Sequence, residues 1–294
     1  MRYLNSKDVA DILGVNISTL KRWTENGTIS CKKTSGGHRK FTMLNVREYF
    51  KKNQKPSKNL NIGLENSFHK IIYNHLNNGE YTKLIKILAE SSIKADELTV
   101  STILNSAYMK DIPVDTIFDE IVEPASDLVE DALKNKNISH LDAYISRKLI
   151  TRIIEGYNQN IPNSTSKRKA ALCINFEDNL PDLGVIMSEI ISRHNGYNTF
   201  NAGSHAEMGD LKSVLKQKTV DTLIFYLCDR QCCMASATDN LVKTEKQIIS
   251  IIKSAKIFQV KTIFGGRGLK FFPQLNGKID HTFYKFSELK NLLS

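Results

Sequence analysis

The chain has 294 residues, of which 41% are hydrophobic and 24% are charged, and its formal net charge is +10. This length allows two or three domains with apolar cores. No stretch approaches the roughly 18–20 apolar residues that a membrane-spanning helix needs, and no apolar signal core follows Met1, so we expect no membrane association. Five cysteines without a signal sequence indicate reduced thiols, and we expect a cytoplasmic protein.

The positive charge is concentrated at the N-terminus. Residues 1–60 contain 13 Lys and Arg against 4 Asp and Glu, a net charge of +9, whereas the remainder contains 28 against 27. A basic module on a nearly neutral body is typical of proteins that bind nucleic-acid phosphates. The alternative is a set of solvated surface lysines without a partner.

Residues 1–55 predict a helix-turn-helix. Apolar residues at helical spacing from Val9 to Leu13 indicate a first helix, capped by Ser6 and ended by Gly14. A second helix beginning at Asn16 or Ser18 would enter the major groove by its N-terminal end. We expect its exposed residues to contact bases and phosphates, and Trp23 to fill the small core. The residues expected on that face are Asn16, Ser18, Thr19, Lys21 and Arg22.

A basic hairpin is predicted to follow. Ile29 and Cys31 alternate with polar neighbours as in a strand, and Ser35-Gly36-Gly37 supplies a tight turn. The returning strand carries His38, Arg39 and Lys40, which we expect beside the DNA, with Arg39 and Lys40 on its phosphates. Val46, Tyr49 and Phe50 then indicate a closing helix.

The segment from Tyr3 to Phe50 resembles the winged-helix head of the MerR family and its excisionase-like relatives. The resemblance rests on residues 13–15, 19–23, Gly27 and 36–41, which follow the order and spacing of that family. It implies binding of promoter DNA as a dimer on inverted or direct repeats. Metal-sensing members follow the head with a long heptad helix and then ligand cysteines, and no such extended coiled-coil pattern follows Phe50 here.

Residues 56–62 are predicted to form a linker, because they lie in a polar, basic stretch that contains Pro56. From residue 63 to residue 160, sets of apolar residues at helical spacing predict a helical bundle of four or five helices, punctuated by Pro113 and Pro124. The bundle requires no cofactor. We expect it to serve self-association into a dimer or tetramer, or to bind a protein partner.

Residues 167–294 predict a Rossmann-like α/β domain. Apolar runs at 170–174 and 222–227, together with residues 198–202 and 261–264, indicate strands, and residues 184–194, 208–217 and 243–255 indicate helices between them. Strands that alternate with helices form a parallel, doubly wound sheet, whose ligands bind at the carboxyl ends of the strands.

The order of the three parts resembles that of cobalamin-binding MerR-type regulators, including light-sensing ones. The matching positions are Asp182-Leu183-Gly184, Gly196-Tyr197, Ala202-Gly203 and Gly265-Gly266. The resemblance implies a cobalamin-binding domain over about 120 residues, so the residues that would hold the cofactor decide whether that function is retained.

Those residues have changed. The family's Asp-x-His-x-x-Gly motif, whose histidine ligates cobalt, reads Asn179, Pro181 and Gly184 here, and proline offers no lone pair to a metal. The tryptophan and Glu-His pair of light-sensing members correspond to Leu133, Ala143 and Tyr144, and the usual strand-three serine falls near Cys228. Phe271 and Phe272 could crowd a nucleotide tail. We therefore predict a degenerate pocket at Asn179, Pro181, Gly184, Cys228, Gly265 and Gly266, with no cobalamin and no metal.

Other chemistry is weakly indicated. Cys228, Cys232 and Cys233 could form a soft-metal or redox site, or be incidental thiols. Residues 265–268 could cradle a phosphate or simply form a turn. No nucleophile and base pair indicates catalysis, so we expect no enzyme activity.

The sequence thus predicts an oligomeric DNA-binding transcription regulator, a repressor that acts without cobalamin. One alternative is a sensor whose last domain binds another small molecule, a protein, or cobalamin without a histidine ligand. A corrinoid methyltransferase-like enzyme fused to a DNA-binding head is the other, and Pro181 argues against it.

Overall fold

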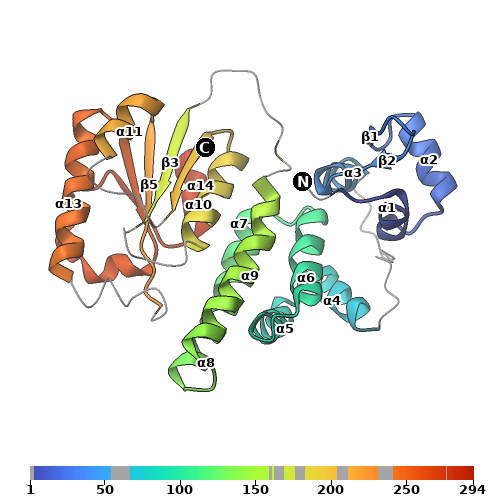
Figure 1. Cartoon of the computed structure of the whole chain (residues 1–294), viewed down its shortest axis with the longest axis horizontal. Coiled ribbons are helices and arrows are strands. Elements are labelled where there is room, and N and C mark those ends of the chain that lie inside the picture. The colour runs from blue at the N-terminus through green and yellow to red at the C-terminus, as the bar shows by residue number, and fades with distance from the viewer. Residues whose placement is uncertain are drawn as a thin grey trace. The chain divides into compact units, whose positions relative to one another are not determined.

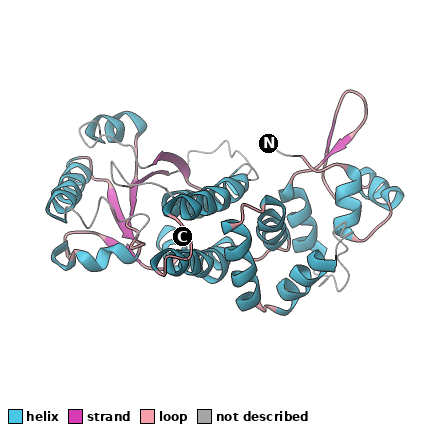
Figure 2. Cartoon of the chain, turned by 60° about the horizontal axis from the view of Figure 1, so that its bottom comes forward, coloured by secondary structure: helices cyan, strands magenta, loops and turns pink. Residues whose placement is uncertain are grey.

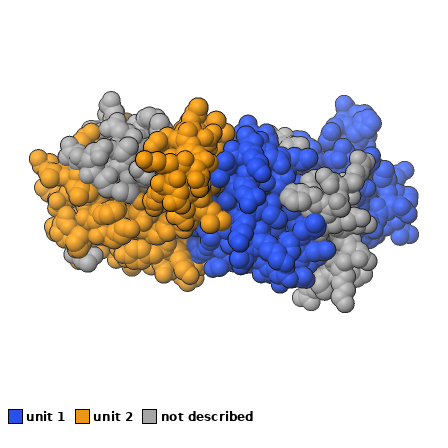
Figure 3. Space-filling model, turned by 90° about the horizontal axis from the view of Figure 1, so that it is seen from below, with its two compact units in different colours: residues 1–125, 152–161 blue, residues 126–151, 162–294 orange. Residues whose placement is uncertain are grey.

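A computed structural model describes residues 3–53, 67–158, 161, 169–175, 183–203, 211–230, 241–275 and 277–294. It divides into two compact units, one formed by residues 1–125 and 152–161 and the other by residues 126–151 and 162–294 (Figure 3). The predicted bundle, 63–160, is therefore shared between the units. The predicted linker, 56–62, lies outside the described residues.

The first unit begins with the helix-turn-helix, which we call the head (residues 3–53). Its elements are α1 (Ser6–Leu13), α2 (Ile17–Glu25), β1 (Lys32–Lys33), β2 (Arg39–Lys40) and α3 (Met43–Asn53). The strands form an antiparallel hairpin (Figure 2). Leu4 forms an isolated bridge with Phe41. The buried side chains of Val9, Leu20 and Phe41 centre a small core, as the apolar spacing predicted.

The rest of the first unit is helical. It contains α4 (Ser67–Asn78), α5 (Tyr81–Ile93), α6 (Glu97–Met109), α7 (Val114–Ile117) and the π-helical turn η1 (Phe118–Val122), with the end of α9 (His140–Asn158). The rings of Tyr108 and Tyr157 stack with centroids 4.3 Å apart, and Phe118 lies parallel to Tyr157. Burying these large aromatic surfaces together stabilises the helical core.

The second unit is a parallel α/β domain (Figure 1). Its sheet has the strand order β4-β3-β5-β6-β7, where the strands are β3 (Ala170–Ile174), β4 (Asn198–Gly203), β5 (Thr222–Tyr226), β6 (Lys261–Gly265) and β7 (His281–Phe283). This is the doubly wound order whose ligand crevice lies at the switch point between the first and third strands. The predicted fold class is confirmed. The sequence analysis had not included β7.

Helices cover both faces of the sheet. Helices α10 (Leu183–His194) and α14 (Phe286–Leu293) pack together on one face, and α11 (Leu211–Lys218) and α13 (Leu241–Ile257) on the other (Figure 1). The second face holds a large apolar core that includes Leu223, Phe225 and Ile251. Helix α8 (Glu123–Lys134) and the first half of α9 complete the unit. Among the described helices, none is long and apolar enough to cross a membrane.

Candidate nucleic-acid interface and candidate ligand crevice

The turn between α1 and α2 is built by local hydrogen bonds and one glycine. Asn5, and not the predicted Ser6, caps α1, because its side chain accepts from the Asp8 amide while the Asp8 carboxylate accepts from the Asn5 amide. This reciprocal capping box leaves Ser6 inside the helix. Gly14 ends α1 at φ 64°, as predicted, and the chain enters α2 at Asn16, whose side chain makes no capping hydrogen bond.

The N-terminal end of α2 presents polar and basic side chains. Asn16, Ser18, Lys21 and Arg22 are exposed and Thr19 is half-buried, so the structure brings the predicted set to one helix. Ile17 stands beside them with 54% of its surface exposed, an apolar residue that the sequence analysis did not single out. Short polar groups and a methyl-bearing side chain at such an end suit base edges in a major groove.

The hairpin differs from its prediction in where its first strand begins. Ile29 is buried in the head core, and pairing starts at Lys32 and Lys33, opposite Lys40 and Arg39. Gly37 closes the turn at φ 77°, and the Thr34 hydroxyl accepts from the His38 amide. His38, Lys32 and Lys33 are exposed. The two lysines are additional basic candidates, and their adjacency in the sequence was the available signal.

Arg39 has structural partners within the head. Its Nε donates to Thr24 Oγ1 at 2.7 Å, and its Nη2 lies 3.0 Å from Glu25 Oε1. Only 15% of its side chain is exposed. The guanidinium therefore ties β2 to the C-terminal turn of α2. This contact positions the hairpin beside α2, and the expected phosphate contact by Arg39 stays a prediction.

Two further contacts fix the head. Trp23 stacks on Tyr49 with ring centroids 5.1 Å apart, which confirms its place against the core. Arg47 joins α3 to α6: its Nη1 donates to the Tyr108 carbonyl at 2.7 Å and its Nε lies 2.9 Å from Asp111. Sequence reasoning missed Arg47, because an arginine on a polar helix face carries no signal of a distant partner.

Doubly wound sheets bind ligands at the carboxyl ends of the strands where the order reverses, which are β3 and β5 here. We call the region beside the first turn of α10 and the loops after β5 and β6 the crevice. Gly184 lies in the first turn of α10, and Tyr226 is the last residue of β5. A Cβ placed on Gly184 would lie 2.2 Å from two carbons of the Tyr226 ring. The absence of a side chain at Gly184 thus makes room for this ring.

An aromatic ring also occupies the space beside a second glycine. A Cβ on Gly265, at the end of β6, would lie 2.0 Å from the ring of Phe283. Tyr226 stacks on Phe286 at 5.7 Å between centroids, and Phe283 lies 6.2 Å from Tyr226. We call Tyr226, Phe283 and Phe286 the aromatic cluster; their exposed fractions are 6%, 1% and 2%.

Phe271 and Phe272 do not take part in this arrangement. Phe272 is buried in the core on the α11 and α13 side of the domain, and Phe271 packs against that core. The prediction that these two rings crowd a nucleotide site is therefore wrong. The aromatic cluster lies against Gly184 and Gly265 instead, and sequence reasoning missed it because its members lie up to 60 positions apart.

The glycine-rich loop after β6 is held by backbone hydrogen bonds. The Gly266 amide donates to the Phe283 carbonyl at 3.0 Å, and the Gly268 amide donates to the Leu227 carbonyl at 3.0 Å. These donors are used within the fold, which favours the turn over the phosphate cradle. The half-buried Cys228 lies on the facing loop, and Asn179, Pro181, Cys232 and Cys233 lie outside the described residues.

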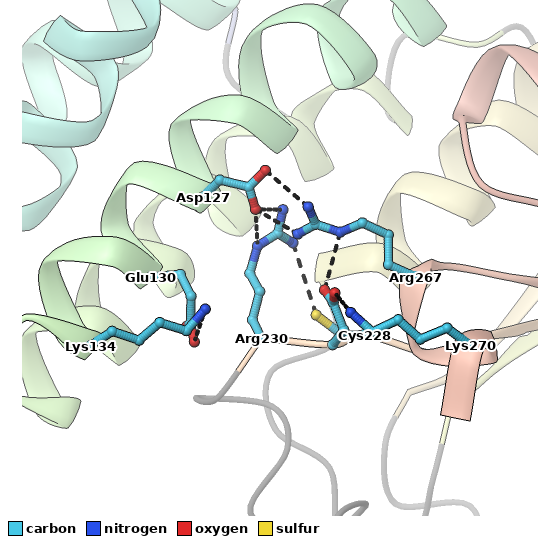
Figure 4. A network of polar contacts seen from close by, with 8 residues as sticks. Asp127, Glu130, Lys134, Cys228, Arg230, Arg267 and Lys270 are labelled. Atoms are coloured by element: carbon cyan, nitrogen blue, oxygen red, sulfur yellow. Dashed lines mark hydrogen bonds and ion pairs between the residues drawn. The ribbon is translucent and has the colours of Figure 1, made fainter. Parts of the chain in front are cut away.

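A cluster of charges joins α8 to the carboxyl end of the sheet (Figure 4). One Asp127 oxygen lies 2.9 Å from Arg230 and 2.6 Å from Arg267, which follow β5 and β6 respectively. Asp229 contacts Arg267 at 3.1 Å and Lys270 at 2.8 Å. We call these five residues the Asp127 network. Burial alone would raise the pKa of Asp229, but the hydrogen bond from Lys270 and the surrounding positive charges lower it overall.

Among the described residues, no group of three or more His, Cys, Asp or Glu is arranged to hold a metal ion. Two of the three cysteines of the candidate cluster, Cys232 and Cys233, lie outside the described residues, so a soft-metal or redox site there stays a prediction.

Comparison with known proteins finds a family match for the head and a similar fold for most of the chain. A family model described as a helix-turn-helix domain matches residues 3–54. The monomethylamine corrinoid protein of Methanosarcina barkeri is similar in structure, with 14% identity and a TM-score of 0.52 over 72% of this chain and 97% of that chain. No curated protein matches the sequence. The chain therefore has an N-terminal helix-turn-helix DNA-binding domain and a fold similar to that of a corrinoid protein.

Two further structures show weaker likeness. The methanol:cobalamin methyltransferase complex of M. barkeri has 13% identity over 71% of this chain and 78% of that chain. A cobalamin-binding protein of Desulfitobacterium hafniense has 11% identity over 71% and 96%. Both have a TM-score of 0.35, which is too low to support an argument about the fold.

Proposed function

We propose that this protein is a MerR-type transcription regulator that represses transcription from promoter DNA. The observation that carries the proposal is the exposed N-terminal end of α2, set beside a basic hairpin in a segment that matches helix-turn-helix domains. In this proposal Asn16, Ser18 and Thr19 read bases. Lys21, Arg22, His38 and Lys40 contact phosphates, and Arg39 orients the hairpin.

The proposal includes self-association. One head reads only a half-site, and two heads related by symmetry read a repeat. Leu141, Tyr144 and Ile145 are exposed at helical spacing on α9, which suits contact with a second copy. If size-exclusion chromatography with light scattering finds a monomer at micromolar concentration, with or without DNA, the oligomeric part of the proposal is wrong.

We further propose that the protein does not use cobalamin and is not an enzyme. Pro181 cannot ligate cobalt, and the rings of Tyr226 and Phe283 lie where the crevice glycines leave room. The residues that line the crevice therefore do not fit a corrinoid. The fold likeness then concerns architecture alone.

The test uses the full chain, DNA from upstream of its own gene, and fluorescence anisotropy. Binding should be salt-dependent, and its affinity should be the same with and without cyanocobalamin or adenosylcobalamin, in light and in dark. An unrelated DNA of equal length is the control. A cobalamin-dependent affinity would favour the sensor alternative, and absence of specific binding to any promoter fragment would overturn the regulator.

A further inference from the structure

The crevice of the α/β domain is formed by the elements that hold ligands in doubly wound sheets. Its walls are the first turn of α10, which follows β3, and the loops that follow β5 and β6. Glycines in such places allow the backbone to approach a ligand closely. Whatever occupies the space beside Gly184 and Gly265 therefore decides whether a ligand can bind there.

Protein side chains occupy it. The Tyr226 ring lies against Gly184 and the Phe283 ring against Gly265, close enough that an added Cβ would overlap either ring. Phe286 stacks on Tyr226 with an interplanar angle of 10°, so the tyrosine ring is held between α14 and α10. The Tyr226 ring thus has the contacts of a bound planar ligand, because it stacks on Phe286 and has Gly184 on its other side.

The Asp127 network holds α8 at the same end of the sheet. The Asp127 carboxylate joins two arginines from different loops, and only 5% of the Arg230 side chain is exposed. Removing the carboxylate would take a charged partner from a buried guanidinium, which destabilises the contact. The contact between α8 and the two loops therefore does not require a ligand between them.

We propose that the aromatic cluster is a built-in occupant of the ligand crevice and that the Asp127 network keeps α8 closed on the sheet without any ligand. The α/β domain then has the conformation of a liganded domain at all times. This inference rests on the proposed absence of cobalamin from the α/β domain, and it does not depend on DNA binding.

The first experiment opens the crevice. Tyr226→Ala in the full chain should lower Tm, and 4-methylphenol, which has the shape of the missing side chain, should raise that Tm in a concentration-dependent way. Wild type and Tyr226→Phe, which keep the ring, should show no such rise. No rise for Tyr226→Ala, or an equal rise for wild type, would overturn the proposal. If Tyr226→Ala does not fold, Tyr226→Leu takes its place in the same comparison.

The second experiment releases α8. Asp127→Asn should speed amide hydrogen exchange in residues 126–134 by at least about tenfold, because local opening becomes easier. Glu97→Gln is the matched control, since Glu97 forms an exposed pair with Arg152. Equal protection of residues 126–134 in wild type and Asp127→Asn would show that the network does not keep α8 closed.

Discussion

The head and the α/β domain use glycines for different ends. In the head, Gly14 and Gly37 shape turns that leave the polar residues of α2 and the hairpin facing solvent. In the α/β domain, Gly184 and Gly265 make room for rings of the same chain. The first arrangement leaves side chains available to a partner, and the second fills the place where a partner would bind. A fold can thus keep the outline of a ligand site after its own side chains have filled it.

If this contrast is right, substitutions in the two regions should affect different measurements. The largest effect is expected for Lys21→Ala with Arg22→Ala, both exposed on α2. Both residues are assigned to phosphates, and each lost phosphate contact lowers the salt slope by about one. We expect at least about a tenfold loss of DNA affinity, with Tm unchanged. Fluorescence anisotropy at several salt concentrations measures both quantities.

Lys253→Ala is the matched control, because Lys253 is an exposed lysine of α13 in the α/β domain. It removes a positive charge without touching the head. The α2 variant removes two charges and Lys253→Ala removes one. If Lys253→Ala lowers affinity by half as much as the α2 variant, or more, on a logarithmic scale, binding depends on total charge and α2 is not the reading element.

The next largest effect is expected in the α/β domain, where a substitution should lower stability and leave DNA affinity unchanged. Gly184→Ala should destabilise the protein by about 1–3 kcal/mol, because the new methyl group overlaps the Tyr226 ring, which Phe286 holds in place. DNA affinity below the unfolding temperature should stay at the wild-type value. Urea unfolding followed by far-UV circular dichroism measures the change.

Gly156→Ala and a double variant provide the controls. A Cβ on Gly156, in α9, meets only a methionine methyl at 3.7 Å, so this substitution should be neutral or should stabilise the helix by up to about 1 kcal/mol. Gly184→Ala should lower the free energy of unfolding by less in a Tyr226→Ala background than in the wild type. Equal costs in both backgrounds would show that the ring does not occupy the space beside Gly184.

Much of this arrangement could be predicted from the sequence, because local rules determine it. Apolar spacing gave α1, α2 and the helices of the sheet, and short apolar runs gave β3, β5 and β6. The direction of the Tyr226 ring could not be predicted, since Tyr226 is only one residue of an apolar run. The pair of Asp127 and Arg230 is separated by 103 positions, and only tertiary packing joins them. Strand β7 has three residues, of which His281 and Thr282 are exposed, so no apolar run marked it.

A smaller effect would separate the two possible roles of Arg39. If the residue orients the hairpin through Thr24 and Glu25, Arg39→Ala should lower stability by about 1 kcal/mol. Arg39→Lys should lose most of that stability, because an ammonium group cannot reproduce the forked contact. DNA affinity and Tm would be measured for both variants. If Arg39→Lys keeps wild-type stability and affinity, Arg39 acts as a charge on the phosphates, and its contact with α2 has no positioning role.

The smallest effect concerns pH in the Asp127 network. The pKa of Asp229 is lowered in the folded protein, so its carboxylate stabilises the fold above the unfolded-state pKa and loses that contribution as pH falls through the folded pKa. Lys270→Met removes an exposed partner of Asp229 and should cost only about 0.2–1 kcal/mol near neutral pH. The difference in Tm between wild type and Lys270→Met should then shrink as pH falls below about 4. A difference that stays constant down to about pH 3 would mean that Lys270 acts through packing on Phe271 and not through the Asp229 charge.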